Sequence, residues 1–132
     1  MKFSKLDSIP LVLKIASFAL VGIGVLQLLS LFFPSLGPGI EGKELTSPIL
    51  IVCMGIFHTL LGLAILTSNK LAVPAIIALP AIQYGVFYLN HGLPETEALK
   101  LHAIFTGGWV LFFGCYLFFT KAKYYFRGQP NA

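Results

Sequence analysis

The amino-acid sequence predicts an all-α integral membrane protein, a bundle of four transmembrane helices with both termini in the cytoplasm. The chain of 132 residues is 57% hydrophobic and only 11% charged, whereas soluble domains average about 25% charged residues. It contains four apolar runs of the length needed to cross a hydrocarbon core, about 20 residues for about 30 Å. Its basic residues gather at the ends of these runs and mostly on one side of the predicted membrane.

The four spans are predicted at residues 10–33, 48–67, 71–89 and 101–120, in a single domain over residues 1–132. The first run follows Lys2 and Lys5, as a signal peptide would. However, it is too long and lacks a small-residue cleavage site, so we expect it to remain as a membrane anchor.

Proline, glycine and polar residues mark the ends of the spans. Pro10 and Pro48 each open a run shortly after a serine, where the missing N–H of proline costs nothing. Segment 34–39 carries two prolines and two glycines and is expected to turn. Only residues 68–70 separate the second and third runs, which predicts a tight antiparallel hairpin.

The third run contains two internal prolines, Pro74 and Pro80. Each removes a backbone hydrogen bond and its ring clashes with the preceding turn, so we expect the helix to kink. Membrane helices tolerate such breaks where neighbours satisfy the freed carbonyls.

The orientation follows from the distribution of basic residues. With both termini cytoplasmic, seven of the nine basic residues lie inside and two lie outside, in agreement with the positive-inside rule. The inner set is Lys2, Lys5, Lys14, Lys70, Lys121, Lys123 and Arg127, and the outer set is Lys43 and Lys100. Residues 124–126, two tyrosines and a phenylalanine, are expected to anchor the inner interface.

Polar side chains inside the spans are few, and each is a functional hypothesis by default. At about 1.5 Å per residue, Gln27, Gln83 and Thr106 lie roughly 8 to 9 Å below the outer surface, and His58 lies about 15 Å below it. Their depths predict a polar pocket in the outer half of the bundle. The candidate ligand-binding residues are His58, Gln27, Gln83, Thr106, Trp109 and Tyr84.

Helical spacing predicts which way His58 faces. Gly55, His58 and Gly62 are three and four residues apart and share one face, and small residues on a face permit close approach of helices. We therefore expect His58 to point into the bundle. A structural role stays open, because a transmembrane histidine can simply bond a neighbouring helix, at about 0.6 to 2 kcal/mol.

Neither metal binding nor a disulfide is predicted. His91 and His102 are expected at the outer rim, where solvation explains them. Cys53 and Cys115 differ in predicted depth by about 14 Å, and a disulfide needs Cα atoms within about 7 Å.

Absent motifs restrict the function classes. No Asp or Glu lies within a span, which argues against a proton-coupled drug antiporter. No catalytic triad, HExxH or glycine-rich phosphate loop occurs. The apolar inner half argues against a channel, and the composition argues against a nucleic-acid partner.

A resemblance to a known family rests on the layout of the helices and on one segment. The four runs, the long first loop, the short second loop and the glycine-spaced segment 55–70 resemble the DoxX-like family. The resemblance implies a small protein of the bacterial inner membrane, in a group of which some members are associated with quinone-linked sulfur or redox metabolism. It implies no catalytic residue.

Two functions are compatible with these observations. The first is binding of a lipophilic ligand (a quinone, a lipid or a sterol-like molecule) or a role as a subunit of a membrane complex, with His58 and Gln83 bonding the ligand head. The alternative is a small membrane enzyme that uses His58 as general acid or base. The expected partners are membrane lipids, a lipophilic small molecule, and a second copy or another membrane subunit. No cofactor is defined.

Overall fold

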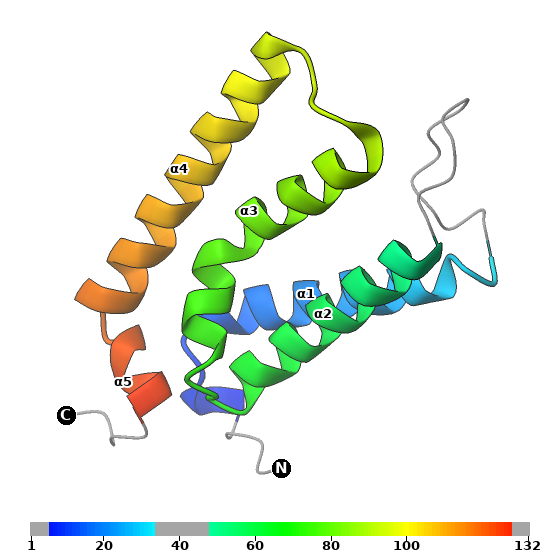
Figure 1. The fold of residues 1–132 in the computed structure, drawn as a ribbon. Coiled ribbons are helices and arrows are strands. Elements are labelled where there is room, and N and C mark those ends of the chain that lie inside the picture. The colour runs from blue at the N-terminus through cyan, green and yellow to red at the C-terminus, as the bar shows by residue number, and fades with distance from the viewer. Residues whose placement is uncertain (1–5, 34–47, 128–132) are drawn as a thin grey trace. The chain divides into compact units, whose positions relative to one another are not determined.

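The computed structural model describes residues 6–33 and 48–127, and these residues form helices and contain no strand. A 3-10 turn, η1 (Leu6–Ser8), precedes α1 (Leu11–Leu29) and α2 (Pro48–Leu66). The helices α3 (Ala72–His91), α4 (Thr96–Phe119) and the short α5 (Ala122–Arg127) follow (Figure 1). The predicted all-α fold class is confirmed.

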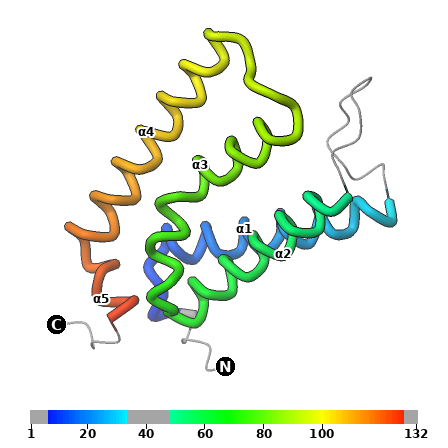
Figure 2. The backbone as a smooth tube through the Cα atoms, in the orientation of Figure 1, coloured from blue at the N-terminus to red at the C-terminus, as the bar shows by residue number. Residues whose placement is uncertain are grey.

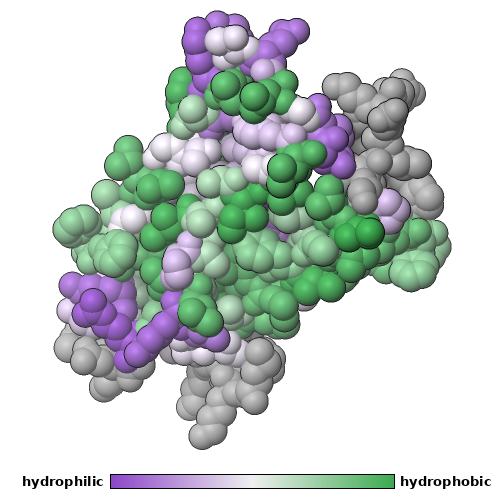
Figure 3. Space-filling view, in the orientation of Figure 1, coloured by the Kyte–Doolittle hydropathy of each residue, from purple (hydrophilic) through white to green (hydrophobic). Residues whose placement is uncertain are grey.

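Four of these helices are long and apolar enough to cross a membrane, with 19, 19, 20 and 24 residues. Large apolar side chains are exposed along all four, among them Phe18, Leu60, Phe87 and Phe112, and hydrophobic residues cover most of the coloured face in Figure 3. This surface suits contact with lipid. The cytoplasmic position of the termini stays a prediction.

The chain divides into two compact units, Met1–Thr67 and Ser68–Ala132. In the first unit α1 and α2 pack antiparallel and very closely. A Cβ added to Gly24 would lie 2.6 Å from the Gly55 carbonyl oxygen, and one added to Gly62 would lie 2.7 Å from the Ser17 carbonyl oxygen. The predicted glycine face of α2 is therefore the face that contacts α1.

In the second unit α3 and α4 form an antiparallel pair joined by a short connection. Gly92 ends α3 with a φ of 81°, a conformation that glycine adopts without strain. Its N–H donates to the Tyr88 carbonyl oxygen over 2.8 Å. Two α3–α4 hydrogen bonds hold the pair, one from Trp109 to Ile76 near the start of α3 and one between His102 and Tyr88 near this connection.

The two prolines of α3 behave differently. Pro74 is the third residue of the helix, where a backbone N–H has no intrahelical acceptor, so the kink predicted there is wrong. Pro80 lies in the interior and leaves the Ile76 carbonyl, four residues earlier, without its helical donor. The Trp109 indole N–H donates to this oxygen over 2.8 Å. Figure 2 shows that the axis of α3 changes direction partway along.

Several helix ends differ from the predicted spans. The fourth helix begins at Thr96 rather than at residue 101, because the first turn after Pro94 is polar yet still helical, with an ion pair of 2.8 Å between Lys100 and Glu97. Hydropathy does not register such an interfacial turn. The first helix ends at Leu29 rather than at residue 33. The predicted turn at 34–39 lies outside the described residues.

Candidate functional site

His58 and Gln27 form a polar link inside the first unit. The His58 Nδ1 lies 2.8 Å from the Gln27 Oε1; the carboxamide oxygen only accepts, so Nδ1 donates. His58 is 1% exposed, and its ring also has a hydrogen bond to the backbone of Met54. The glycines at positions 24 and 55 bring the two helices close enough for this bond.

This geometry agrees with the structural role left open for His58 in the sequence analysis, a hydrogen bond to a neighbouring helix. The bond joins α1 to α2 at their close contact, where a hydrogen bond between helices adds stability. Contact of His58 or Gln27 with a ligand stays a prediction.

A second group of polar side chains lies between α3 and α4, near their connection. The Tyr88 hydroxyl and His102 Nδ1 are 2.7 Å apart. The Tyr84 ring stacks on the His102 imidazole with centroids 4.1 Å apart and an angle of 14° between the planes. Phe105 meets the Tyr84 ring edge-on at 6.4 Å. We refer to Tyr84, Tyr88, His102 and Phe105 as the tyrosine–histidine cluster.

Three polar atoms at this cluster are open. Among the described residues, no hydrogen bond reaches His102 Nε2, the Tyr84 hydroxyl or the hydroxyl of Thr106, one turn after His102 on α4. All three residues are half-buried. Five other hydroxyls, in the helices or at their caps, donate to carbonyl oxygens of their own chain segment, namely those of Ser17, Ser30, Thr59, Thr67 and Thr120.

The cluster also fixes the orientation of the imidazole. The Tyr84 ring stacks on one face of the His102 imidazole, and the Tyr88 hydroxyl bonds its Nδ1 atom. A tyrosine hydroxyl both donates and accepts, so the Tyr88–His102 bond allows either tautomer, and Nε2 can donate to a ligand or accept from it. A ligand atom at Nε2 therefore meets an imidazole whose ring orientation is already held by its neighbours.

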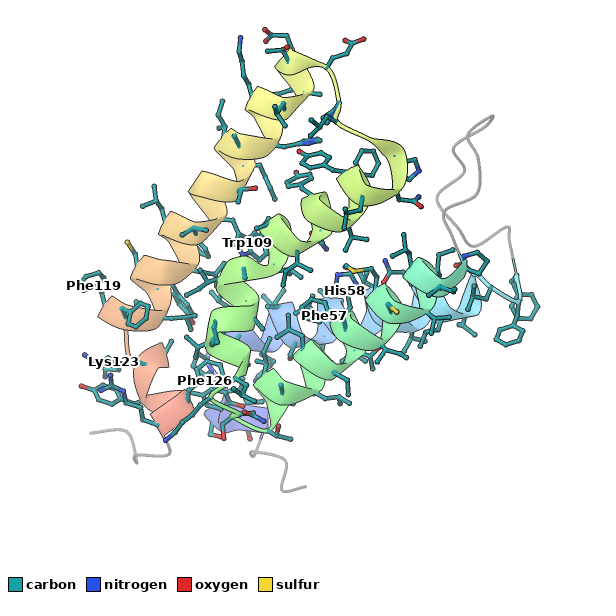
Figure 4. The ribbon with its side chains drawn as sticks, viewed as in Figure 1. Phe57, His58, Trp109, Phe119, Lys123 and Phe126 are labelled. Carbon is teal, nitrogen blue, oxygen red and sulfur yellow. The ribbon has the colours of Figure 1, made fainter. Side chains whose placement is uncertain are left out.

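The structure distributes the six predicted site residues over both units. His58 and Gln27 are bonded to each other. Tyr84 stacks on His102, Thr106 lies one turn further along α4, and Gln83 is exposed on α3. Trp109 points from α4 toward α3 in Figure 4, and its N–H donates to the Ile76 carbonyl oxygen. Trp109 therefore replaces the helical donor that Pro80 removes.

Sequence reasoning did not place His102 or Tyr88 in the site. His102 was expected at the rim because the fourth span was predicted to begin at residue 101, whereas α4 begins five residues earlier. The spacing of Tyr84 and Tyr88, four residues apart on one helical face, is the signal that points to an aromatic surface.

The described part of the chain contains neither a candidate metal site nor a disulfide. Within residues 6–33 and 48–127, no group of three or more His, Cys, Asp or Glu side chains has the arrangement of a metal site. Cys53 and Cys115 are both free and exposed.

Comparisons with protein-family models, with curated proteins and with solved structures give no match to this chain.

Proposed function

We propose that this small integral membrane protein binds a lipophilic molecule with a polar head, and that the tyrosine–histidine cluster and Thr106 bind that head. The observation that carries the proposal is the set of three open polar atoms on facing helices, His102 Nε2, the Tyr84 hydroxyl and the Thr106 hydroxyl. Polar groups in a transmembrane segment are costly unless a partner satisfies them.

The depth of the cluster suits an amphipathic ligand. His102 lies about 9 Å along α4 from its first residue, and Tyr84 lies about 10 Å along α3 from its last, at a rise of about 1.5 Å per residue. Both helices meet at the Gly92 connection, so the two residues lie just below one membrane surface. A molecule whose tail lies in the hydrocarbon would present its head at this level.

The chemistry of the cluster narrows the ligand class. Hydroxyl and imidazole groups bond carbonyl or hydroxyl oxygens, and the Tyr84 and Phe105 rings offer apolar surface to a planar head. A quinone, a lipid or a sterol-like molecule meets these requirements. We further propose, from the charge distribution and the resemblance to DoxX-like proteins, that the protein resides in a bacterial inner membrane with cytoplasmic termini.

The test is native mass spectrometry of the full chain purified in mild detergent, together with analysis of the extracted lipids. We expect the wild type to retain a defined small molecule and the His102→Leu variant to retain up to about tenfold less of it, because a hydrogen bond to the polar head is worth at most about 1.5 kcal/mol.

His91→Leu is the matched control. His91 is an exposed histidine of α3 that stacks on Phe87 and has no hydrogen bond or ring contact with the cluster residues, so the control should retain the molecule. Equal retention by the wild type and His102→Leu would contradict the proposal. If the wild type carries no molecule at all, the proposal also fails and the role of a membrane-complex subunit takes its place.

A further inference from the structure

The chain turns sharply at the end of α4 and enters α5. Thr120 is extended, with φ −103° and ψ 174°, and its hydroxyl accepts a hydrogen bond of 3.2 Å from the Ala122 N–H. Ala122 and Phe126, four residues apart, are 2% and 4% exposed. The apolar face of α5 is therefore packed, and its remaining side chains are presented on the other side.

Two of these remaining side chains, Lys123 and Arg127, are basic, and Lys121 directly precedes the helix. Lys121 and Arg127 are exposed, and the Lys123 ammonium lies 5.0 Å from the centroid of the Tyr124 ring. In the described part of the chain the single ion pair is Lys100–Glu97, near the start of α4, so none of these three cations has a carboxylate partner there. We name Lys121, Lys123 and Arg127 the basic cluster.

The basic cluster lies at the end of an apolar span. Helix α4 is 24 residues long and ends in Phe118 and Phe119, which are 57% and 84% exposed. Charged residues directly after such a helix lie at the depth of lipid headgroups. Figure 3 shows hydrophilic side chains gathered at the α5 end, at the lower left, next to the hydrophobic surface.

We propose that the basic cluster binds the headgroup of an anionic phospholipid. Lysine and arginine make charge-assisted hydrogen bonds to phosphate oxygens, and the planar guanidinium can bind two of them at once. The exposed Phe118 and Phe119 offer surface for the acyl chains. This site lies at the opposite end of α4 from the tyrosine–histidine cluster and takes a ligand of different charge.

The experiment titrates the full-length protein in mild detergent with an equimolar mixture of phosphatidylglycerol and phosphatidylcholine of the same acyl chains. Native mass spectrometry gives the ratio of the two bound lipids. We expect the wild type to prefer phosphatidylglycerol and the triple variant Lys121→Gln, Lys123→Gln, Arg127→Gln to lose the preference, at roughly fivefold for each cation removed.

Two controls separate a site from general attraction by net charge. Lys100→Gln removes a cation at the other end of α4 and should leave the ratio unchanged. The double variant Lys121→Arg, Lys123→Arg keeps the charge and should keep the preference. Helical content by circular dichroism checks that every variant is folded.

Three results would overturn the proposal. The first is an unchanged ratio in the folded triple variant, and the second is an equal loss in Lys100→Gln. The third is complete displacement of phosphatidylglycerol by millimolar glycerol 3-phosphate, since a phosphate ion rather than a lipid would then be the ligand. None of these results bears on the ligand expected at the tyrosine–histidine cluster.

Discussion

Two glycines of α1, two residues apart, have very different surroundings. At Gly24 an added methyl group would meet Thr59 and, at 2.6 Å, the Gly55 carbonyl oxygen, whereas at Gly22 nothing lies within 4 Å. We expect Gly24→Ala to lower the free energy of unfolding by about 1 to 3 kcal/mol, because the backbone of α2 must move away. Thermal unfolding in detergent measures the change.

Gly22→Ala is the matched control for this substitution. It adds the same methyl group to the same helix at an exposed position, and alanine favours a helix over glycine by about 1 kcal/mol. Its unfolding temperature should therefore equal or exceed that of the wild type. Equal destabilisation by the two substitutions would show that close packing of α1 and α2 is not what Gly24 provides.

Residue spacing predicts the face on which a side chain lies but not the partner it meets. The spacing of Gly55, His58 and Gly62 correctly predicts a face that packs against another helix. The bond from His58 to Gln27 depends in addition on how far α1 is shifted along α2. That shift is determined by which glycine meets which backbone segment, and no pattern within one helix contains it.

At the scale of elements, the link from Trp109 to α3 compensates for Pro80. We expect Trp109→Phe to destabilise the protein by about 1 kcal/mol, since the Ile76 carbonyl oxygen loses its donor. In a Pro80→Ala background the alanine N–H can bond this oxygen within the helix, so the same substitution should cost less. Chemical or thermal unfolding of the four proteins gives the coupling between the two positions.

If the cost of Trp109→Phe is the same in both backgrounds, the indole contributes through packing alone. The nearby Phe112→Leu, at an exposed position of α4, serves as a control for the loss of aromatic surface, and its effect should not depend on residue 80.

The existence of the four spans was predictable, whereas several of their ends were not. Hydropathy detects about 20 apolar residues, and all four predicted spans correspond to helices. It does not detect a polar turn at the interface, such as the one from Thr96 to Lys100. Pro74 lies in the first turn whether the third helix begins at residue 71, as predicted, or at Ala72, so its position near the helix start, and not the span boundary, rules out a kink there.

At the scale of the whole molecule, the charge distribution predicts the topology. In a background with Cys53 and Cys115 replaced by alanine, we expect a membrane-impermeant maleimide to label Glu97→Cys in intact cells. Asn69→Cys should be labelled only after the membrane is permeabilised, because Lys70 and the basic residues after α4 predict that the start of α3 lies on the cytoplasmic side. Both positions are exposed, and they lie at opposite ends of the α3–α4 pair.

Labelling of Asn69→Cys alone in intact cells would reverse the predicted orientation. Labelling of both variants in intact cells would mean that α3 and α4 do not each cross the membrane.

Composition was sufficient to predict a membrane protein, whereas the candidate site could be identified only from the contacts between helices. The sequence supplied a depth for His58, Gln27, Gln83 and Thr106 and a helix face for His58, but no contact between helices. In the structure Gln27 bonds His58 in one unit, and Tyr84 stacks on His102 in the other. The open atoms of His102 and Thr106 become visible only once all hydrogen bonds of the described residues are known.

Trp109 is the only tryptophan of the chain, and its indole nitrogen is bonded where α3 bends. All tryptophan emission from this protein therefore originates at one junction between two helices. The protein carries an intrinsic optical probe of that junction, and a shift in its emission would follow separation of α4 from α3 without any attached dye.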